Sequence, residues 1–225
     1  MTDAEFNAKL VLAFTSLRTA DYRASETGDQ ADTRLRGLIE THAGMTCLAS
    51  STWKKKNTKT WKSPYSEARK KVAKGIFKFD AEISSAPIVV DKPNGKQNWP
   101  DCLIVYKKTG LPVEFKRSET GTVVWNSGLP QKGGIYVFNG KDGIMEGTTL
   151  FLGTQVIADD IRLLLETMRD INDGAAKLLN NLIADPTWNL YARPMFNGKS
   201  KPLSNPTRSI IEDEVMAFLT SLSWG

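Results

Sequence analysis

The chain has very little of two residue types on which many metal sites depend. Among 225 residues there is one histidine, His42, and there are two cysteines, Cys47 and Cys102. A single histidine excludes sites in which several imidazoles hold zinc or another soft metal. A metal used by this chain is therefore expected to be held by carboxylates, whose oxygens favour magnesium, calcium or manganese. Two cysteines are too few for a disulfide framework, which favours a reducing compartment.

Long apolar runs and targeting signals are also missing. No stretch approaches the roughly 20 apolar residues that cross a bilayer, and the N-terminus lacks the charged and apolar blocks of a signal peptide. We therefore expect a cytoplasmic protein with no membrane partner. Hydrophobic residues make up 40% of the chain and charged residues 24%, as in globular proteins, and the length suits a single domain over 1–225.

The positive charge of the chain is concentrated in one segment. The whole chain carries 30 basic and 25 acidic residues, a net charge of +5. The basic segment 51–80 holds ten of the basic residues and only two acidic ones, so it carries +8 and the remainder carries −3. A basic block on a weakly acidic body favours a polyanionic partner such as nucleic acid, although a solvated helix face is an equal alternative.

Apolar spacing predicts helices at both ends of the chain and strands between them. The expected helices cover 3–19, 32–41, 66–74, 158–184 (one helix, or two interrupted near Gly174) and 209–222, and the expected strands cover 77–83, 102–106, 113–115, 135–138 and 149–152. The stretch 185–208, rich in proline and polar residues, is expected to be a surface loop. These elements indicate an α/β fold with a mixed central β-sheet flanked by α-helices.

The clearest chemical pattern lies in two short apolar runs separated by the turn-forming residues Lys-Lys-Thr-Gly, which predict a β-hairpin. If Lys107 pairs with Gly110, the numbers of opposite residues sum to 217, and Asp101 lies opposite Lys116. The alternation of side chains along a strand then places Asp101, Glu114 and Lys116 on one face. Two carboxylates and one ammonium group should therefore converge.

Two carboxylates this close repel each other, and a divalent cation would relieve the repulsion. Asp101 and Glu114 are the predicted metal ligands, with the main-chain carbonyl of Phe115 as a third oxygen. Lys116 would orient a water molecule or stabilise charge on a phosphoryl oxygen. The alternative is an acid–lysine surface on an ordinary hairpin.

These residues resemble the motif of the PD-(D/E)xK nuclease superfamily. Pro100 and Asp101 are followed, after twelve residues, by Glu114, Phe115 and Lys116, so that every motif position is filled. Many type II restriction endonucleases are similar in length and in the order of these elements. The resemblance covers about forty residues and implies a restriction-endonuclease-like core with a catalytic hairpin over 99–116.

The resemblance also implies the roles of the site residues. Asp101 and Glu114 would hold Mg²⁺, for which Mn²⁺ could substitute, and Lys116 would lie beside the attacking water. Members of the superfamily often add an acidic residue from the N-terminal helix. Glu40 fits that position best, and Glu82, on the expected preceding strand, is the competing candidate.

The predicted DNA contacts fall into three segments. The basic segment contributes phosphate contacts, and the predicted DNA-reading loops 118–132 and 185–208 contribute amide and cationic groups that can pair with base edges. The predicted DNA-binding residues are Lys54, Lys55, Lys56, Trp125, Asn126, Gln131, Lys132 and Arg193. For any single loop residue, a purely structural role in the turn is about as plausible.

The sequence thus predicts a Mg²⁺-dependent, sequence-specific endonuclease that cuts both strands of duplex DNA. Two active sites are needed to cut two strands at a symmetric site, so we expect a homodimer, with a cognate DNA methyltransferase in the same system. Two alternatives stay open. One is a nuclease of repair or recombination that recognises DNA structure, and the other is a DNA-binding module without catalysis.

Overall fold

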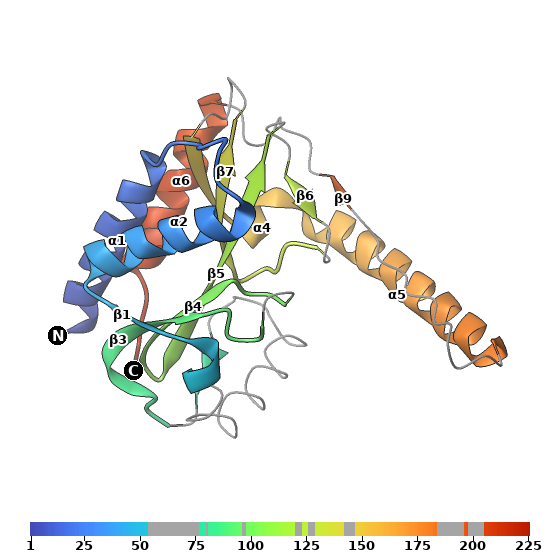
Figure 1. Cartoon of the computed structure of the whole chain (residues 1–225), viewed down its shortest axis with the longest axis horizontal. Helices are drawn as coiled ribbons and strands as arrows, with labels where there is room; N and C mark the ends of the chain where they lie inside the picture. The colour runs from blue at the N-terminus through green and yellow to red at the C-terminus, as the bar shows by residue number, and fades with distance from the viewer. Residues whose placement is uncertain are drawn as a thin grey trace.

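A twisted β-sheet forms the centre of the chain, and helices cover one of its faces (Figure 1). This computed structural model describes residues 1–53, 77–79, 81–95, 98–119, 123–125, 129–141, 147–183, 196–197 and 205–225. Its helices are α1 (Asp3–Arg18), α2 (Gly28–Ala43), α4 (Gly153–Val156), α5 (Asp159–Leu182) and α6 (Asn205–Thr220). Its strands are β1 (Thr46–Leu48), β2 (Phe77–Lys78), β3 (Ser84–Asp91), β4 (Cys102–Lys107), β5 (Thr109–Ser118), β6 (Val124–Trp125), β7 (Ile135–Gly140), β8 (Gly147–Leu152) and β9 (Phe196–Asn197).

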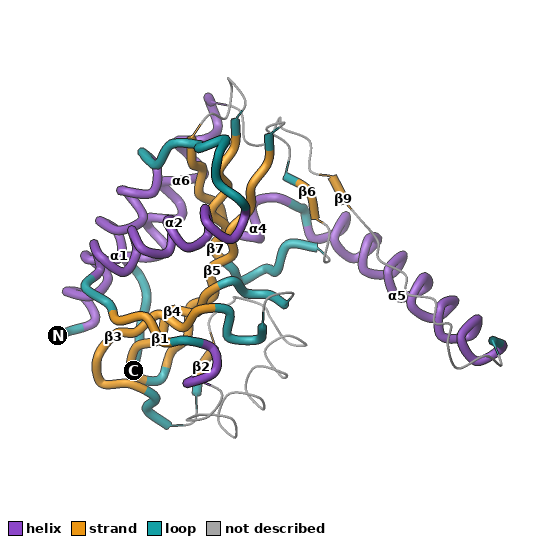
Figure 2. The backbone as a smooth tube through the Cα atoms, viewed as in Figure 1, coloured by secondary structure: helices purple, strands orange, loops and turns teal. Residues whose placement is uncertain are grey.

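The main sheet is mixed, as the sequence predicts. Its strands follow the order β1-β3-β4-β5-β7-β8, and β2 pairs with β5 beside this path. The pairs β1–β3 and β5–β7 are parallel, while β3–β4, β4–β5 and β7–β8 are antiparallel. Strand β7 lies inside the main sheet, between β5 and β8. Strand β6 pairs with β9 in a separate small sheet. Figure 2 shows the strands between the helices α1, α2 and α6 on one side and the start of α5 on the other.

Both N-terminal helices begin at a capping box. The Thr2 hydroxyl accepts from the Glu5 N–H and the Glu5 carboxylate accepts from the Thr2 N–H, and Thr27 and Gln30 repeat this arrangement at the start of α2. The helix expected from Asp32 therefore begins four residues earlier, at Gly28. It ends where Gly44 takes the left-handed conformation, with φ of 64°, that favours glycine.

The core lies between the helices and the sheet. Apolar residues of α1, α2 and α6 pack there on alternate residues of the central strands, including Ile104, Val113 and Phe115. The other face of the sheet carries a smaller cluster that includes Trp53, Leu103 and Val105. Because side chains alternate along a strand, the burial of Phe115 among the helices directs Glu114 to the opposite face.

Strand β3 is the main element that differs from the sequence prediction. The apolar pattern predicts a strand over 77–83, whereas the structure has the two-residue β2 and then an eight-residue strand from Ser84. The serines and Pro87 suggest a break in the strand. A proline is tolerated there because the pairing of β3 with β4 shifts register between Ser84 and Ile88.

The C-terminal elements also differ from expectation in their bounds. Helix α5 runs as one helix through Gly174, where an interruption was a predicted alternative. Helix α6 begins at Asn205, four residues before the expected start. The helix expected over 66–74 lies outside the described residues, as does most of 185–208. Within the described residues no helix is long and apolar enough to cross a membrane.

Candidate active site

The β4–β5 hairpin brings the two motif acids directly opposite each other. Cys102 pairs with Val113 and Tyr106 with Thr109, so opposite residues sum to 215 and not to the assumed 217. The turn has the expected two residues but lies one residue earlier in the chain, at Lys107 and Lys108, where Lys107 takes a positive φ of 50°. A shift of two in the sum preserves the face of every side chain, and it sets Asp101 opposite Glu114 instead of Lys116.

Reciprocal hydrogen bonds join the two acids to each other's strand. The Asp101 N–H donates to Glu114 Oε2 at 3.1 Å, and the Phe115 N–H donates to Asp101 Oδ2 at 2.9 Å. Lys116 Nζ lies 2.9 Å from Glu114 Oε1. The structure therefore brings Asp101, Glu114 and Lys116 together on one face of the hairpin.

The group is largely buried, and its electrostatics reflect this. The exposed fractions of the Asp101 and Glu114 side chains are 18% and 11%. Burial, and then the charge of Asp101, raises the pKa of Glu114 to about 7, against the opposing effect of Lys116. Burial also raises the pKa of Asp101, although the Phe115 N–H and nearby lysines favour its charged form. Two acids held this close carry a desolvation cost that a cation would offset.

The helix acid that reaches this group is Asp32. Lys92 Nζ lies 3.4 Å from Asp32 Oδ2, 3.1 Å from Asp29 Oδ1 and 3.9 Å from Asp101 Oδ1. Burial, and then the charge of Asp101, raises the pKa of Asp32 to about 7. Asp32 on α2, Lys92 after β3 and Asp101 before β4 thus share one electrostatic environment.

Neither acid predicted from the sequence for this role is placed there. Glu40 lies on α2 eight residues beyond Asp32, roughly 12 Å along the helix axis, and pairs with Arg36 at 2.8 Å. Arg36 in turn contacts Asp91. Glu82 is exposed and lies at the opposite end of β4 from Asp101. The N–H of the next residue, Ile83, donates to the carbonyl oxygen of Lys107 at that end.

One sequence signal could have identified Asp32. Asp32, Arg36 and Glu40 form a polar row at four-residue spacing, next to the buried row of Leu35 and Ile39. The row marks the side of the helix that turns toward the sheet. Which residue of this row lies near Asp101 depends on where α2 begins and on how the helix crosses the sheet. The sequence pattern specifies neither of these.

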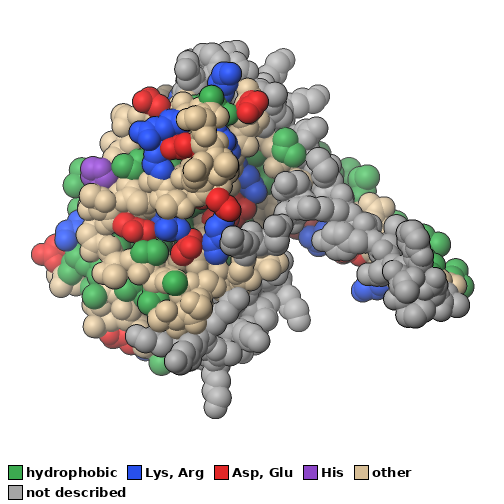
Figure 3. Space-filling model, in the orientation of Figure 1, with side chains coloured by type: hydrophobic (Ala, Val, Ile, Leu, Met, Phe, Trp, Pro, Cys, Tyr) green, Lys and Arg blue, Asp and Glu red, His purple; other side chains and the backbone are tan. Residues whose placement is uncertain are grey.

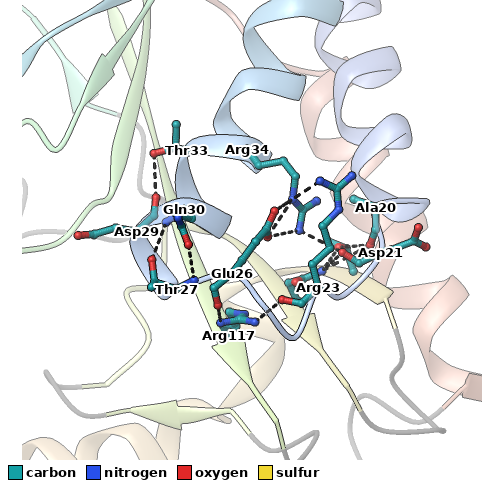
Figure 4. A network of polar contacts seen from close by, with 12 residues as sticks. Ala20, Asp21, Arg23, Glu26, Thr27, Asp29, Gln30, Thr33, Arg34 and Arg117 are labelled. Atoms are coloured by element: carbon teal, nitrogen blue, oxygen red, sulfur yellow. Dashed lines mark hydrogen bonds and ion pairs between the residues drawn. The ribbon is translucent and has the colours of Figure 1, made fainter.

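A second arginine fixes α2 relative to β5. Arg117, next to Lys116, donates to the carbonyl oxygens of Arg23, at 2.6 Å, and Glu26 (Figure 4). The Glu26 carboxylate pairs with Arg34 on α2 at 2.8 Å. The loop between α1 and α2 is therefore tied to the strand that carries Glu114, which fixes the start of the helix that carries Asp32.

The described residues offer oxygen ligands for a small divalent cation. No three His, Cys, Asp or Glu side chains within the described part of the chain are arranged as a metal site. The candidate ligand set is thus the two carboxylates of Asp101 and Glu114 with a main-chain oxygen. The Phe115 N–H points toward Asp101, and the carbonyl of a strand residue points to the same edge as its N–H. Mg²⁺ is commonly held by one or two carboxylates and keeps several waters, so this set fits it.

The predicted DNA contacts that the structure describes have other partners. Trp125 is 3% exposed and packs against Tyr136 and Phe151, so its ring is not presented to solvent. Its ring centroid lies 5.7 Å from Lys116 Nζ, which makes it a neighbour of the site. The Gln131 side-chain amide donates to the Leu129 carbonyl oxygen at 3.5 Å, and Lys132 pairs with Asp159 at 2.5 Å.

The remaining predicted DNA-binding residues lie outside the described residues. They are Lys54, Lys55, Lys56, Asn126 and Arg193. Trp53, at the edge of the basic segment, is fully buried against Phe79.

The comparisons with known proteins give no relative. The chain matches no protein-family model, and neither the curated proteins nor the solved structures include a significant match. The function of the chain is therefore inferred from the geometry of the site and from the motif.

Proposed function

We propose that this chain is a Mg²⁺-dependent, site-specific endonuclease with a restriction-endonuclease-like core, which hydrolyses phosphodiester bonds in both strands of duplex DNA. The observation that carries the proposal is the pairing of Asp101 with Glu114 on adjoining strands, with Lys116 2.9 Å from the Glu114 carboxylate. These contacts, on a mixed sheet flanked by helices, support the proposal together with the motif.

Each site residue has a part in the proposed reaction. Asp101, Glu114 and the Phe115 carbonyl would hold the ion, which when bound polarises the phosphate and acidifies a water molecule. The Lys116 ammonium group would orient the water and stabilise negative charge on a phosphoryl oxygen. Lys92 balances the charges of Asp32 and Asp101 at the edge of the site, and the burial of the acids limits competing solvent.

Digestion of a long unmethylated duplex DNA with Mg²⁺ tests the proposal. Discrete fragments are the expected result, and the Glu114→Gln variant, purified in parallel, should produce none. A smear would favour a nuclease that recognises DNA structure, and DNA binding without cutting would favour a non-catalytic module. A restriction activity also predicts that methylation by a cognate methyltransferase protects the DNA.

A further inference from the structure

Exposed hydrophobic side chains gather on helix α5. Of the thirteen large hydrophobic residues that are exposed in the described part of the chain, nine lie on α5 or directly after it, within 161–183. The helix projects away from the sheet and the other helices, and hydrophobic side chains are visible along its edge (Figures 1 and 3). A concentration of this kind marks an interaction surface, because single exposed hydrophobic residues are normally scattered.

The helix is fixed at its base, and beyond the first turn Ala176 is its one buried residue in the described part of the chain. Arg162 is buried and donates to the carbonyl oxygens of Gly153, at 3.0 Å, and Pro130. Asp159 pairs with Lys132 at 2.5 Å. These contacts hold the first turn of α5 against the body, so the following turns are presented in a defined direction.

The apolar residues of α5 repeat with the period of a coiled coil. Steps of three and four residues alternate through Ile161, Leu164, Met168, Ile171, Ala175, Leu178 and Leu182, which we call the α5 seam, and every member is exposed. A repeat of 3.5 residues sustained over three heptads is suited to packing along a second helix with the same period.

From Leu165 onward the positions that flank the α5 seam are uncharged, and Asp160, directly before Ile161, is the one charged flanking residue. The uncharged positions are occupied by Leu165, Thr167, Asn172, Gly174, Leu179 and Asn181, while the other charged residues of α5 lie farther round the helix. Charges at the flanking positions of a coiled coil select a complementary partner and repel an identical one. Beyond the first turn, no charge beside the seam therefore opposes pairing with a second α5.

The length of α5 suffices for a stable contact. Its 24 residues make a rod about 36 Å long and about 11 Å across, and half of the side surface of such a rod is roughly 600–700 Å². Two copies would bury about 1,200–1,400 Å² together, at the lower end of the range for stable interfaces.

We propose that α5 is a dimerisation helix, along whose seam the α5 of a second copy of this chain packs about a two-fold axis. A self-complementary seam closes on itself, which gives a dimer and no larger assembly. The inference goes beyond the proposed nuclease activity and does not depend on it, since it uses neither the acidic site nor DNA. It would supply the two active sites that cutting both strands requires.

Sedimentation equilibrium of the full chain tests the proposal, from about 1 to about 100 µM and without DNA or metal. The wild-type chain should show twice the monomer mass of 24.9 kDa. The double variant Ile171→Lys/Leu178→Lys should be monomeric, with a dissociation constant raised about 100-fold or more. Circular dichroism at a temperature below the onset of unfolding should show the same helix content in the double variant as in the wild-type chain.

Leu163→Lys is the matched control. Leu163 and Leu178 are both 67% exposed, but Leu163 lies about 100° round the helix from the centre of the seam. This variant should remain dimeric. A wild-type monomer at the highest concentration, or equal dissociation by Leu163→Lys and the double variant, would overturn the proposal, as would a dimer that survives the double variant.

Disulfide cross-linking gives a second measurement if the lysine variants do not fold. Ile171 lies at the middle of the seam, so Ile171→Cys meets its counterpart in a parallel or an antiparallel pair. In a Cys47→Ser background, mild oxidation should link Ile171→Cys chains and should not link Leu163→Cys chains; equal linking of both would contradict the seam. A dimer that cuts no DNA would reject the nuclease and leave this inference intact.

Discussion

The Glu114 carboxylate accepts a hydrogen bond of 3.1 Å from the main-chain N–H of Asp101, the acid directly opposite it on the hairpin. The Asp101 carboxylate in turn accepts from the residue after Glu114, at 2.9 Å. The two acids are thus oriented by each other's backbone. A substitution that preserves the shape of either side chain should keep this arrangement while it removes a negative charge.

Asp101→Asn and Glu114→Gln should therefore each abolish cleavage and leave DNA binding intact or tighter. Each change removes an anionic metal ligand and also reduces repulsion of the phosphates. The loss in rate should exceed the roughly 10–100-fold that substitution of outer residues of a metal site costs. A cleavage assay beside a gel-shift titration measures both effects. Glu82→Gln, an exposed control, should cut normally, and near wild-type cutting by either site variant would refute the assignment.

Substitutions of Asp32 and of Glu40 should have different effects on the cleavage rate, because only one of these α2 acids lies beside the site. Asp32 shares Lys92 with Asp101, so Asp32→Asn should lower the cleavage rate about 10–100-fold at limiting Mg²⁺. Glu40→Gln should change it less than about threefold, since Glu40 pairs with Arg36 whereas Asp32 pairs with Lys92 beside Asp101. Rates across a Mg²⁺ titration compare the two. The reverse order of effects would return the role to Glu40.

The raised pKa of Glu114 predicts how stability depends on pH without metal. Its ordinary pKa is 4.5, and burial raises it to about 7 in the folded chain. Between these values the folded state retains a proton that the unfolded state has lost, so the free energy of unfolding falls as pH rises through this window. Relative to wild type, Glu114→Gln should gain up to about 3 kcal/mol at pH 8 and little at pH 4.5.

Urea denaturation at several pH values in the presence of a chelator measures this dependence. Mg²⁺ should stabilise the wild-type chain at pH 8, where the acids are ionised, and have little effect at pH 5. A wild-type curve parallel to that of Glu114→Gln from pH 4.5 to 8 would show that ionisation of the Glu114 carboxyl does not destabilise the folded chain.

Sequence pattern determines the site acids because it specifies the faces of a strand. Asp101, Glu114 and Lys116 share a face under either register, since the assumed and observed pairings differ by two. Which residue lies opposite Asp101 depends on the left-handed conformation of Lys107, and composition does not reveal this because lysine rarely adopts it. The sequence therefore predicts which residues share a face of the β4–β5 hairpin, but not which residues lie opposite each other.

Long-range packing decides what the pattern leaves open. Asp32 and Glu40 occupy the same helical row, and only the placement of α2 across the sheet distinguishes them. Trp125 has an aromatic ring of the kind that can stack on DNA bases, yet its packing against Tyr136 and Phe151 buries it. Strand β3 contains a proline that a local reading treats as a break, and its pairing with β4 accommodates it.

The basic segment and the loops should contribute differently to DNA binding. Replacing Lys54, Lys55 and Lys56 with alanine should weaken cognate and random DNA alike, and lower the salt dependence by about 0.9 log units for each phosphate that is no longer neutralised. Gln131→Ala or Asn126→Ala should cost about 1–3 kcal/mol on the cognate site only, if each pairs with a base edge. Binding of cognate and random DNA, measured across a salt series, distinguishes these two contributions. If the amide variants bound both DNAs equally weakly, the loops would contribute affinity and not specificity.

The metal requirement of cleavage tests the central claim most directly. Initial rates of plasmid cleavage should be high in Mg²⁺ or Mn²⁺ and absent in Ca²⁺ or after thorough chelation, while gel shifts show that Ca²⁺ still supports binding. The reason is an all-oxygen ligand set, in which Ca²⁺ tolerates looser geometry and acidifies water less. Cleavage that persists after chelation, or that Asp101→Asn and Glu114→Gln both retain in Mg²⁺, would contradict the assignment of these two acids as the metal ligands of a nuclease.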